Sequence, residues 1–460
     1  MTATPILLRR APAETTPIWP ITEADAEAWL AAQDDATRAW LTATEFKPTA
    51  GAHRLLPGPD GAPRGVVLGL GDGNDMWAWG ELPRALPAAT YRVEGELAGE
   101  AATRAAVAWG LGGYRFTRYK APEGELASLA MPAGADADLA EAMVAGTALT
   151  RDLVNTPAGD LGPAELAAAA QALAERHGAD CNVISGDALL LNNFPMIHAV
   201  GRASSRAPRL IDLTWGDANA PKVTLVGKGV CFDSGGLDLK PAAGMLRMKK
   251  DMGGAATVLG LAAVIMARKL PVRLRVLVPA VENSVSGNAF RPGDVLATRK
   301  GLTVEIGNTD AEGRLVLGDA LTLAAEEEPA LLVDCATLTG AARVALGQDL
   351  PALFCDDDAL VADIAEHGAA WQDPTWRMPL HAPYKERLNS PVADMNNVSE
   401  GAFGGSITAA LFLQRFTEPA KSWAHIDLYA WNDKPRPGRP QGGEAMVLRA
   451  LYGTIAARYG

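Results

Sequence analysis

The sequence contains 460 residues, more than a single core of ordinary size requires, so two domains are expected. Hydrophobic residues make up 48% of the chain and charged residues 21%, a composition that excludes disordered and fibrous proteins and favours a folded α/β protein. The formal net charge of -12, without any block of Lys and Arg, argues against nonspecific binding to nucleic acid, which needs clustered positive charge.

The cysteines and the N-terminal segment indicate the compartment. The four cysteines lie far apart in the chain and two of them fall in apolar runs, which favours buried free thiols over disulfides or a zinc knot. They are Cys181, Cys231, Cys335 and Cys355. Residues 1–20 lack the apolar core of a signal peptide, and no later segment reaches membrane-spanning length without charge or Pro. These features predict a cytoplasmic protein with no membrane partner.

The N-terminal region has the mixed pattern of a small α/β domain. Helical periodicity covers residues 23–43 and 101–111, and β-type apolar runs cover residues 65–70 and 114–120. The segment 122–135 is rich in Pro, Gly and Ala and is predicted to be a linker. The expected N-terminal domain with its linker therefore covers residues 1–135.

Strands and helices alternate from residue 136 onward. A connecting helix is predicted at 137–155, closed by Thr156-Pro157, and another at 163–177 with Pro at its start. Further strands are expected at 210–215, 223–227, 274–278, 330–334 and 423–428, and further helices at 255–268, 314–325, 359–367 and 406–416. Near-continuous apolar strands that alternate with helices are typical of a parallel sheet buried between helices. The predicted fold class is α/β, with a small N-terminal α/β domain and a larger C-terminal catalytic domain over residues 136–460. In the larger domain, helices would flank a central mixed, largely parallel sheet.

Three motifs follow strand candidates, at the edge where such sheets bind ligands. The first, over residues 226–241, places Lys228, Asp233 and Lys240 in a Gly-rich and otherwise apolar setting. A lysine buried there needs a partner or must lose its proton. The motif is not a P-loop, because the glycine spacing before Lys228 is wrong and no Ser or Thr follows this lysine.

The other two motifs contribute carboxylates. Asp251 lies in MKKDMGGAA, just before a predicted helix, where it could equally be a plain helix cap. Asp310 and Glu312 lie two residues apart in NTDAEGR and cannot share one helix face, although an irregular turn could direct both to one centre. Without a cation such neighbours repel, so this motif taken alone is better explained as a solvated acidic turn.

Taken together, the carboxylates of Asp233, Asp251, Asp310 and Glu312 favour a metal centre. Two divalent ions roughly 3.5 to 4 Å apart are the usual arrangement that clamps a water beside a polarised carbonyl. All six histidines lie outside the motifs, so the site would be rich in oxygen, which suits Mn, Mg or Co, with Zn as an alternative. If Lys228 is a ligand, its amine must be neutral, which a nearby dication would enforce.

In this order, VGKGVCFDSGGLDLKP, MKKDMGGAA and NTDAEGR closely resemble the motifs of the leucyl aminopeptidase (cytosol aminopeptidase) family of dinuclear metallopeptidases. Further matches are LVNTP at 153–157, EN at 282–283, RPGD at 291–294, ATLTGA at 336–341 and GGSITAA at 404–410. The resemblance covers about residues 153–431.

The resemblance implies a metal-binding set. Two divalent ions, Mn or Zn with Co or Mg as alternatives, would be bound by Lys228, Asp233, Asp251, Asp310 and Glu312. Asp233 and Glu312 would bridge the ions, Lys228 and Asp251 would complete the tighter site, and Asp310 the more exchangeable one.

The same resemblance implies the other roles. Lys240 would polarise the scissile carbonyl and stabilise the oxyanion, and Arg314 would hold a bicarbonate ion that shuttles the proton from the metal-activated water. The substrate-contact positions would be Met248, Thr337, Leu338 and Gly340, with Met248 lining the pocket for the first side chain.

The implied activity is a metal-dependent aminopeptidase, a hydrolase that releases leucine or other apolar residues from peptides with a free N-terminus. The family also implies a homohexamer, built in part by the N-terminal domain. A second hypothesis is a DNA-binding accessory protein, as some relatives are, but the acidic charge argues against a nucleic-acid partner. A third, a dinuclear phosphoesterase, is disfavoured because such sites usually recruit histidines as well.

The chain departs from the family after the strand at 423–427. The family usually continues with a small residue and glycine, whereas this chain has Leu428-Tyr429-Ala430-Trp431. Because this segment lies near the pocket in relatives, bulky Tyr429 and Trp431 leave open which first side chain of the substrate is preferred, although packing in the core is the commoner role of such aromatic residues. His425, within the strand, is expected to orient backbone in the core.

Overall fold

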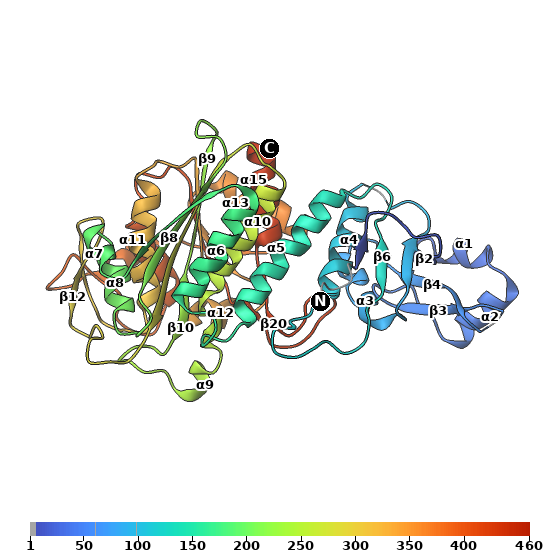
Figure 1. Cartoon of the computed structure of the whole chain (residues 1–460), viewed down its shortest axis with the longest axis horizontal. Coiled ribbons are helices and arrows are strands. Elements are labelled where there is room, and N and C mark those ends of the chain that lie inside the picture. The colour runs from blue at the N-terminus through green and yellow to red at the C-terminus, as the bar shows by residue number, and fades with distance from the viewer. Residues whose placement is uncertain (1–5, 60, 98) are drawn as a thin grey trace. The chain divides into compact units, whose positions relative to one another are not determined.

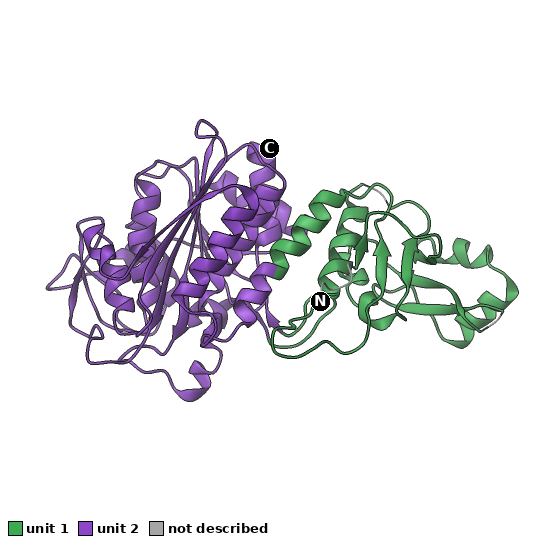
Figure 2. Ribbon diagram, in the orientation of Figure 1, with its two compact units in different colours: residues 1–148, 433–441 green, residues 149–432, 442–460 purple. Residues whose placement is uncertain are grey.

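The computed structural model describes residues 6–59, 61–97 and 99–460, and the chain forms two compact units (Figures 1 and 2). One unit comprises residues 1–148 and 433–441, and the other comprises residues 149–432 and 442–460. The segment 433–441 therefore belongs to the first unit although it follows the last large strand of the second.

The first unit is built on a six-stranded sheet in the order β1-β6-β5-β2-β4-β3, in which all neighbours are parallel except β3 and β4. Its strands are β1 (Leu7–Leu8), β2 (Thr16–Ile21), β3 (His53–Pro57), β4 (Pro63–Gly69), β5 (Thr90–Val93) and β6 (Ser128–Ala130). Its helices are α1 (Ala26–Ala31), α2 (Asp35–Ala43), η1 (Met76–Trp79), α3 (Leu82–Ala85) and α4 (Glu100–Gly112), and α5 (Ala137–Asn155) leads into the second unit.

Local sequence patterns misplace part of this unit. The strand expected at residues 114–120 is wrong, because this segment has no strand partner and turns into solvent. The sheet is completed instead by β6, which lies within the expected linker at 122–135 and is buried between β1 and β5. The helical stretch at 23–43 is two helices, since Asp34 accepts a hydrogen bond from the Thr37 amide (2.7 Å) and caps α2.

The second unit is built on a nine-stranded sheet with the path β16-β15-β18-β14-β9-β11-β8-β7, and β10 pairs with β11. Its strands are β7 (Asp180–Ser185), β8 (Arg209–Trp215), β9 (Lys222–Gly227), β10 (Gly229–Asp233), β11 (Arg273–Asn283), β14 (Leu331–Ala336), β15 (Ala352–Cys355), β16 (Trp376–Met378) and β18 (Trp423–Asp427). Smaller sheets contain β12 (Val295–Ala297), β13 (Thr303–Glu305) and β17 (Met395–Asn396), and β19 (Trp431–Asn432) with β20 (Gly442–Gly443).

The helices of the second unit are α6 (Pro163–His177), α7 (Ala188–Leu191), α8 (Pro195–Gly201), α9 (Ala242–Met245), η2 (Met248–Met252), α10 (Gly253–Ala267), α11 (Glu312–Ala325), α12 (Gly340–Leu346), α13 (Asp358–Ala370), η3 (Ala382–Leu388), α14 (Gly405–Gln414) and α15 (Leu448–Tyr459). The strands β10, β11, β9, β14 and β18 are parallel in the centre. Toward the edges, β8 is antiparallel to both β11 and β7, and β15 is antiparallel to β18 but parallel to β16. This mixed, largely parallel sheet between helices confirms the predicted fold class.

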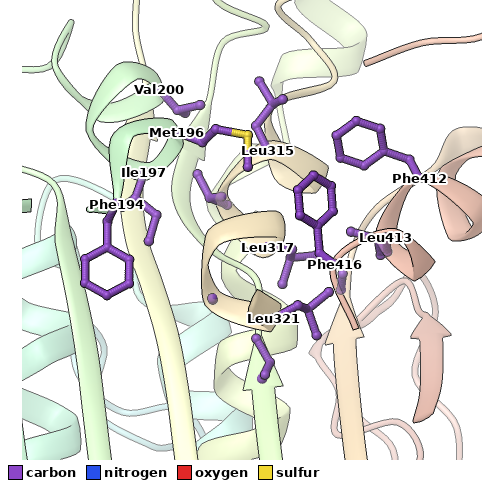
Figure 3. Close-up of a cluster of buried hydrophobic side chains, with 14 of the residues drawn as sticks. Phe194, Met196, Ile197, Val200, Leu315, Leu317, Leu321, Phe412, Leu413 and Phe416 are labelled. Carbon is purple, nitrogen blue, oxygen red and sulfur yellow. The ribbon is translucent and has the colours of Figure 1, made fainter. Parts of the chain in front are cut away.

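Helices cover both faces of the large sheet (Figure 1). On one face α8, α11 and α14 form an apolar layer, whose side chains are drawn in Figure 3, and α6 and α10 pack on the other. The labelled residues of the layer are Phe194, Met196, Ile197, Val200, Leu315, Leu317, Leu321, Phe412, Leu413 and Phe416. Each of these large side chains contributes about 1.5–3 kcal/mol on leaving water, so the layer holds the start of α11 firmly on the sheet.

Helix α10 is apolar on all sides. The run Met248–Ala267 would suffice to cross a membrane by length and composition, but 94% of its most apolar window is buried inside the unit, as expected of a core helix. Small residues at its N-terminus let it approach β14, since a Cβ on Gly254 would lie 2.0 Å from the carbonyl oxygen of Cys335.

Replacing Gly254 by Ala is therefore expected to destabilise the protein by about 1–3 kcal/mol, because α10 and β14 must move apart. Urea denaturation followed by circular dichroism measures the change. The matched control is Gly287→Ala, where the added methyl group meets nothing within 4 Å and a change below about 0.5 kcal/mol is expected. Equal denaturation midpoints for the two variants would contradict the packing argument.

Candidate metal centre

Five parallel strands deliver polar residues to one edge of the large sheet. Lys228 follows β9, Asp233 ends β10, Asn283 ends β11, Thr337 follows β14 and Asp427 ends β18. The pairings Asp233 with Asn283 and Ala336 with Asp427 place these ends in register. The carboxyl edge of a parallel sheet is where α/β proteins bind ligands, so the topology itself builds a candidate site.

The carboxylates of the three motifs converge at this edge. One carboxylate oxygen from each of Asp233, Asp310 and Glu312 lies within 4.8 Å of the others. Asp251 joins the cluster through Lys228, whose Nζ lies 2.7 Å from Asp251 Oδ2 and 2.9 Å from Glu312 Oε1. The structure thus brings together every residue that the sequence motifs singled out as a metal ligand.

Two lysines lie between the carboxylates. Lys240 Nζ is 2.8 Å from Asp233 Oδ2 and also pairs with Asp310. Lys228 Nζ donates to the carbonyl oxygen of Thr337 at 3.0 Å as well as pairing with the carboxylates. Burial alone would lower the pKa of both lysines, but the surrounding carboxylates outweigh it and raise the pKa of each.

The electrostatics of the cluster favour an added cation. Burial, followed by repulsion from Asp233, raises the pKa of Glu312 to about 8 and that of Asp310 to about 6. Both oxygens of Glu312 and Oδ2 of Asp251 are buried and accept no hydrogen bond within the described residues, although Lys228 is close to two of them. Orphaned carboxylate oxygens held within a few ångström of one another fit a divalent ion with oxygen ligands.

Asp251 is not a helix cap. It lies inside η2, while the residue before α10 is Met252, and its Oδ1 accepts a hydrogen bond from the hydroxyl of Thr337 at 2.8 Å. The alternative that explained this aspartate by local structure alone is therefore wrong.

Two uncharged polar residues, Asn283 and Thr309, hold together the segments that carry Asp233 and Asp310. Asn283 Nδ2 donates to Asp233 Oδ1 (2.9 Å) and to the carbonyl oxygen of Thr309 (3.0 Å). The buried Thr309 hydroxyl donates to the carbonyl oxygen of Gly235 at 2.6 Å. Sequence reasoning noted Asn283 only within the family match Glu282-Asn283 and assigned it no role; a second signal is that a polar amide closes an eleven-residue strand that is otherwise mostly apolar.

Arg314 occupies the first turns of α11 beside the cluster. Its Nη1 donates to the carbonyl oxygen of Asn397 at 2.7 Å, and burial lowers its pKa to about 10. Asn397 in turn accepts from the Gly307 amide (2.8 Å) and donates to the Asn308 carbonyl (2.7 Å), so it fixes the NTDAEGR turn. The buried Nε of Arg314 finds no acceptor among the residues that the structure describes.

A cavity of about 940 Å³ opens onto these residues. Its lining includes Lys228, Asp233, Lys240, Asp251, Asp310 and Arg314 as well as the expected substrate-contact residues Met248, Thr337, Leu338 and Gly340, while Glu312 lies beneath it. Asp427 holds the loop that follows β14, because its Oδ1 accepts from the amides of Leu338 (3.0 Å) and Thr339 (3.2 Å).

In the segment after β18, which departs from the family pattern, the two aromatic residues lie in different places. Tyr429 lines the cavity, whereas Trp431 lies beside Lys249, whose Nζ is 5.5 Å from the centroid of the Trp431 ring. His425 is buried in the core, as expected, but its Nδ1 lies 2.6 Å from a side-chain oxygen, Asp334 Oδ1, and not beside a backbone group.

The fold and the site define a class, the α/β proteins with an oxygen-rich carboxylate centre at the carboxyl edge of a largely parallel sheet. Residues 148–452 match the family model "Cytosol aminopeptidase family, catalytic domain", and residues 16–132 match "M17 aminopeptidase, N-terminal domain". The chain belongs to the cytosol aminopeptidase family, a family of metallo-aminopeptidases.

Relatives and solved structures agree with this membership. A probable cytosol aminopeptidase of Stenotrophomonas maltophilia is 41% identical over 429 residues, which are 88% of this chain and 87% of that protein. Another, of Syntrophotalea carbinolica, is 44% identical over 310 residues, and the match covers 66% of this chain and 62% of that protein. The crystal structure of cytosol aminopeptidase from Coxiella burnetii has a TM-score of 0.95 at 47% identity, covering 99% of this chain and all of that one. The bottromycin maturation enzyme BotP in complex with Mn has a TM-score of 0.88 at 36% identity, covering 97% of this chain and all of that one.

Proposed function

We propose that the protein is a metal-dependent aminopeptidase that hydrolyses the first peptide bond of peptides with a free N-terminus. The observation that carries the proposal is the convergence of Asp233, Asp251, Asp310, Glu312 and Lys228 at the sheet edge, under a cavity large enough for a peptide end. These residues would hold two divalent ions, Mn or Zn, which supply Lewis acidity at the scissile bond when bound.

The two lysines take different roles because their surroundings differ. The side chain of Lys228 is 3% exposed and is enclosed by Asp251, Glu312 and the Thr337 carbonyl, as suits a residue of the metal-binding set. As a ligand it would have to be neutral, which a dication favours. The side chain of Lys240 is 15% exposed and lies on the cavity wall, where its ammonium can polarise the scissile carbonyl and stabilise the oxyanion.

Arg314 would hold a bicarbonate ion that moves the proton, in place of a side-chain base. It lines the cavity and keeps a buried, unused donor at Nε, as an anion site requires. Among the described residues, every carboxylate that lines this cavity near Arg314 belongs to the proposed metal set except Asp427, which is committed to the amides of Leu338 and Thr339.

Substrate and organisation complete the proposal. Met248 and Leu338 provide apolar lining, so leucine and other apolar first residues are accepted, with Thr337 and Gly340 as further contacts. Residues 136–460 act as the catalytic domain and 1–135 as the N-terminal domain, which the two family matches support. By analogy with the family, the protein is a cytoplasmic homohexamer.

The test is hydrolysis of leucine p-nitroanilide by chelator-stripped protein with Mn, Zn, Co or Mg added back. Stripping is expected to remove activity and one or more of these metals to restore it, because the carboxylates alone repel one another and offer no Lewis acid. N-acetyl-leucine p-nitroanilide is the control and should not be cleaved, since its amino group cannot engage the site. No activity with any metal, from a folded protein that binds two ions, would overturn the aminopeptidase assignment.

A further inference from the structure

The cavity carries a group of cations that the proposed chemistry does not use. Lys250 is 5% exposed, lines the cavity and donates no hydrogen bond to any acceptor in the described residues; the carboxylate within ion-pair range is Asp251, at 3.9 Å. Arg343, on α12, lines the cavity as well and is exposed. Neither residue belongs to the metal set or to the groups assigned to the reacting bond.

The ring of Tyr429 gathers these cations. Lys250 Nζ lies 4.9 Å and the Arg343 guanidinium carbon 5.2 Å from the ring centroid, and Arg247 donates to the Tyr429 hydroxyl at 3.3 Å. Cation–π contacts orient a charge but leave its hydrogen-bond donors free. The residue that departs from the family pattern thus serves as the support for a cationic wall.

A cationic wall of this kind is incomplete without an anion. The Lys250 side chain is only 7% exposed, so water solvates its ammonium poorly, and like charges gathered on one ring repel. Asp251, 3.9 Å from Lys250, already pairs with Lys228 at 2.7 Å and is a proposed metal ligand. Asp427, which also acts on Lys250, is committed to the amides of Leu338 and Thr339. Neither carboxylate is therefore free to neutralise Lys250. A carboxylate that the substrate brings to this wall would supply the missing negative charge and would accept charge-assisted hydrogen bonds from its cations.

We infer that the cavity also accepts acidic first residues, with Lys250 and Arg343 binding the side-chain carboxylate of an N-terminal Asp or Glu. This inference rests on the proposed aminopeptidase activity and widens its substrate class. The apolar side of the cavity, with Met248 and Leu338, takes the aliphatic part of the side chain, and the cationic wall takes its charged end.

The experiment compares kcat/KM for the p-nitroanilides of Glu, Gln and Leu in the metal-loaded protein. These substrates have no C-terminal carboxylate, and Glu and Gln differ only in charge. The wild type is expected to prefer Glu over Gln, and this preference should fall at least about tenfold in Lys250→Met and in Arg343→Met, because each loses a charge-assisted hydrogen bond. The matched control is Lys249→Met, since Lys249 Nζ donates to the Asn155 carbonyl at 2.6 Å, and its Glu-to-Gln ratio should match the wild type.

The outcomes separate the two proposals. Cleavage of the Leu substrate without any Glu preference, or a preference that both variants retain, overturns the inference and leaves the aminopeptidase standing. If none of the substrates is cleaved with any metal, the aminopeptidase assignment is wrong and the inference falls with it. Should Lys250→Met fail to fold, Arg343→Met on the exposed face of α12 still decides. Leu-Gly, which has a free C-terminal carboxylate, serves as a further substrate. If the variants lower kcat/KM for Leu-Gly but not for Glu p-nitroanilide, the cations bind the C-terminal carboxylate of the substrate and not the side chain of its first residue. This result would also overturn the inference.

Discussion

Glu312→Gln and Asp310→Ala are each expected to lower kcat/KM by at least about a thousand-fold, because either change removes ligand oxygens and a Lewis acid contributes several kcal/mol to the transition state. Glu312 is the more critical of the two. Both of its oxygens are buried and accept no hydrogen bond from the residues that the structure describes, and Oε1 has an ion-pair partner in Lys228 Nζ at 2.9 Å. Asp310 is more exposed, and its loss should be partly offset by high concentrations of added metal.

Metal content per chain and circular dichroism accompany the kinetics. Glutamine keeps the volume of Glu312, and Lys228 retains Asp251 as a partner at 2.7 Å, so both variants should fold. The matched control is Glu326→Ala, which removes a carboxylate paired with Arg299 near the far end of α11 and should keep full activity. An Asp310→Ala or Glu312→Gln protein with wild-type activity and two bound ions would refute the ligand set.

The candidate site was predictable from sequence because its charged residues are local to strand ends. Lys228 follows β9 and Asp233 ends β10, while Asp310 lies just before the apolar helix α11 and Glu312 is its first residue, so a parallel topology alone sends them to one edge. Repulsion between Asp310 and Glu312 made a solvated turn the simpler local explanation. The structure shows instead that Glu312 is 1% exposed, which no local pattern reveals.

Sequence patterns could not predict contacts between segments that lie far apart in the chain. Asn283 reaches Asp233 across 50 residues, and Asn397 holds Arg314 across 83. The same limit applies to the first unit, where β6 comes from a segment whose Pro, Gly and Ala content predicts a linker, and a more strand-like run at 114–120 stays outside the sheet. Whether such a segment becomes a strand depends on the strand beside it, because its backbone N–H and C=O groups need hydrogen-bond partners on a neighbouring strand whose edge is unpaired.

The second substitution for which we expect a large loss of activity is at Lys240. Glycines after β10 shape its loop, since Gly235 and Gly236 have φ of +87° and +67° and a Cβ on Gly235 would lie 2.5 Å from the Asp238 carbonyl oxygen. The loop carries Lys240 back over the cluster, where its ammonium pairs with Asp233 and Asp310 at the cavity wall. A cation in this position can serve the developing oxyanion, while the enclosed Lys228 cannot reach it without breaking its contacts.

Lys240→Met is therefore expected to lower kcat by about a hundred- to a thousand-fold with little change in KM, as for the loss of one oxyanion donor. Metal content should stay at the two ions per chain proposed for the wild type, because Lys240 is outside the proposed metal-binding set. Lys228→Met should differ in kind, with reduced metal content and activity that extra metal does not restore. Steady-state kinetics on leucine p-nitroanilide and metal analysis of both variants provide the comparison. If Lys240→Met lost metal and Lys228→Met kept it, the roles proposed for the two lysines would have to be exchanged. If Lys240→Met kept its kcat, no side chain at the cavity wall would be needed to stabilise the oxyanion. That task would then fall to the metal centre alone.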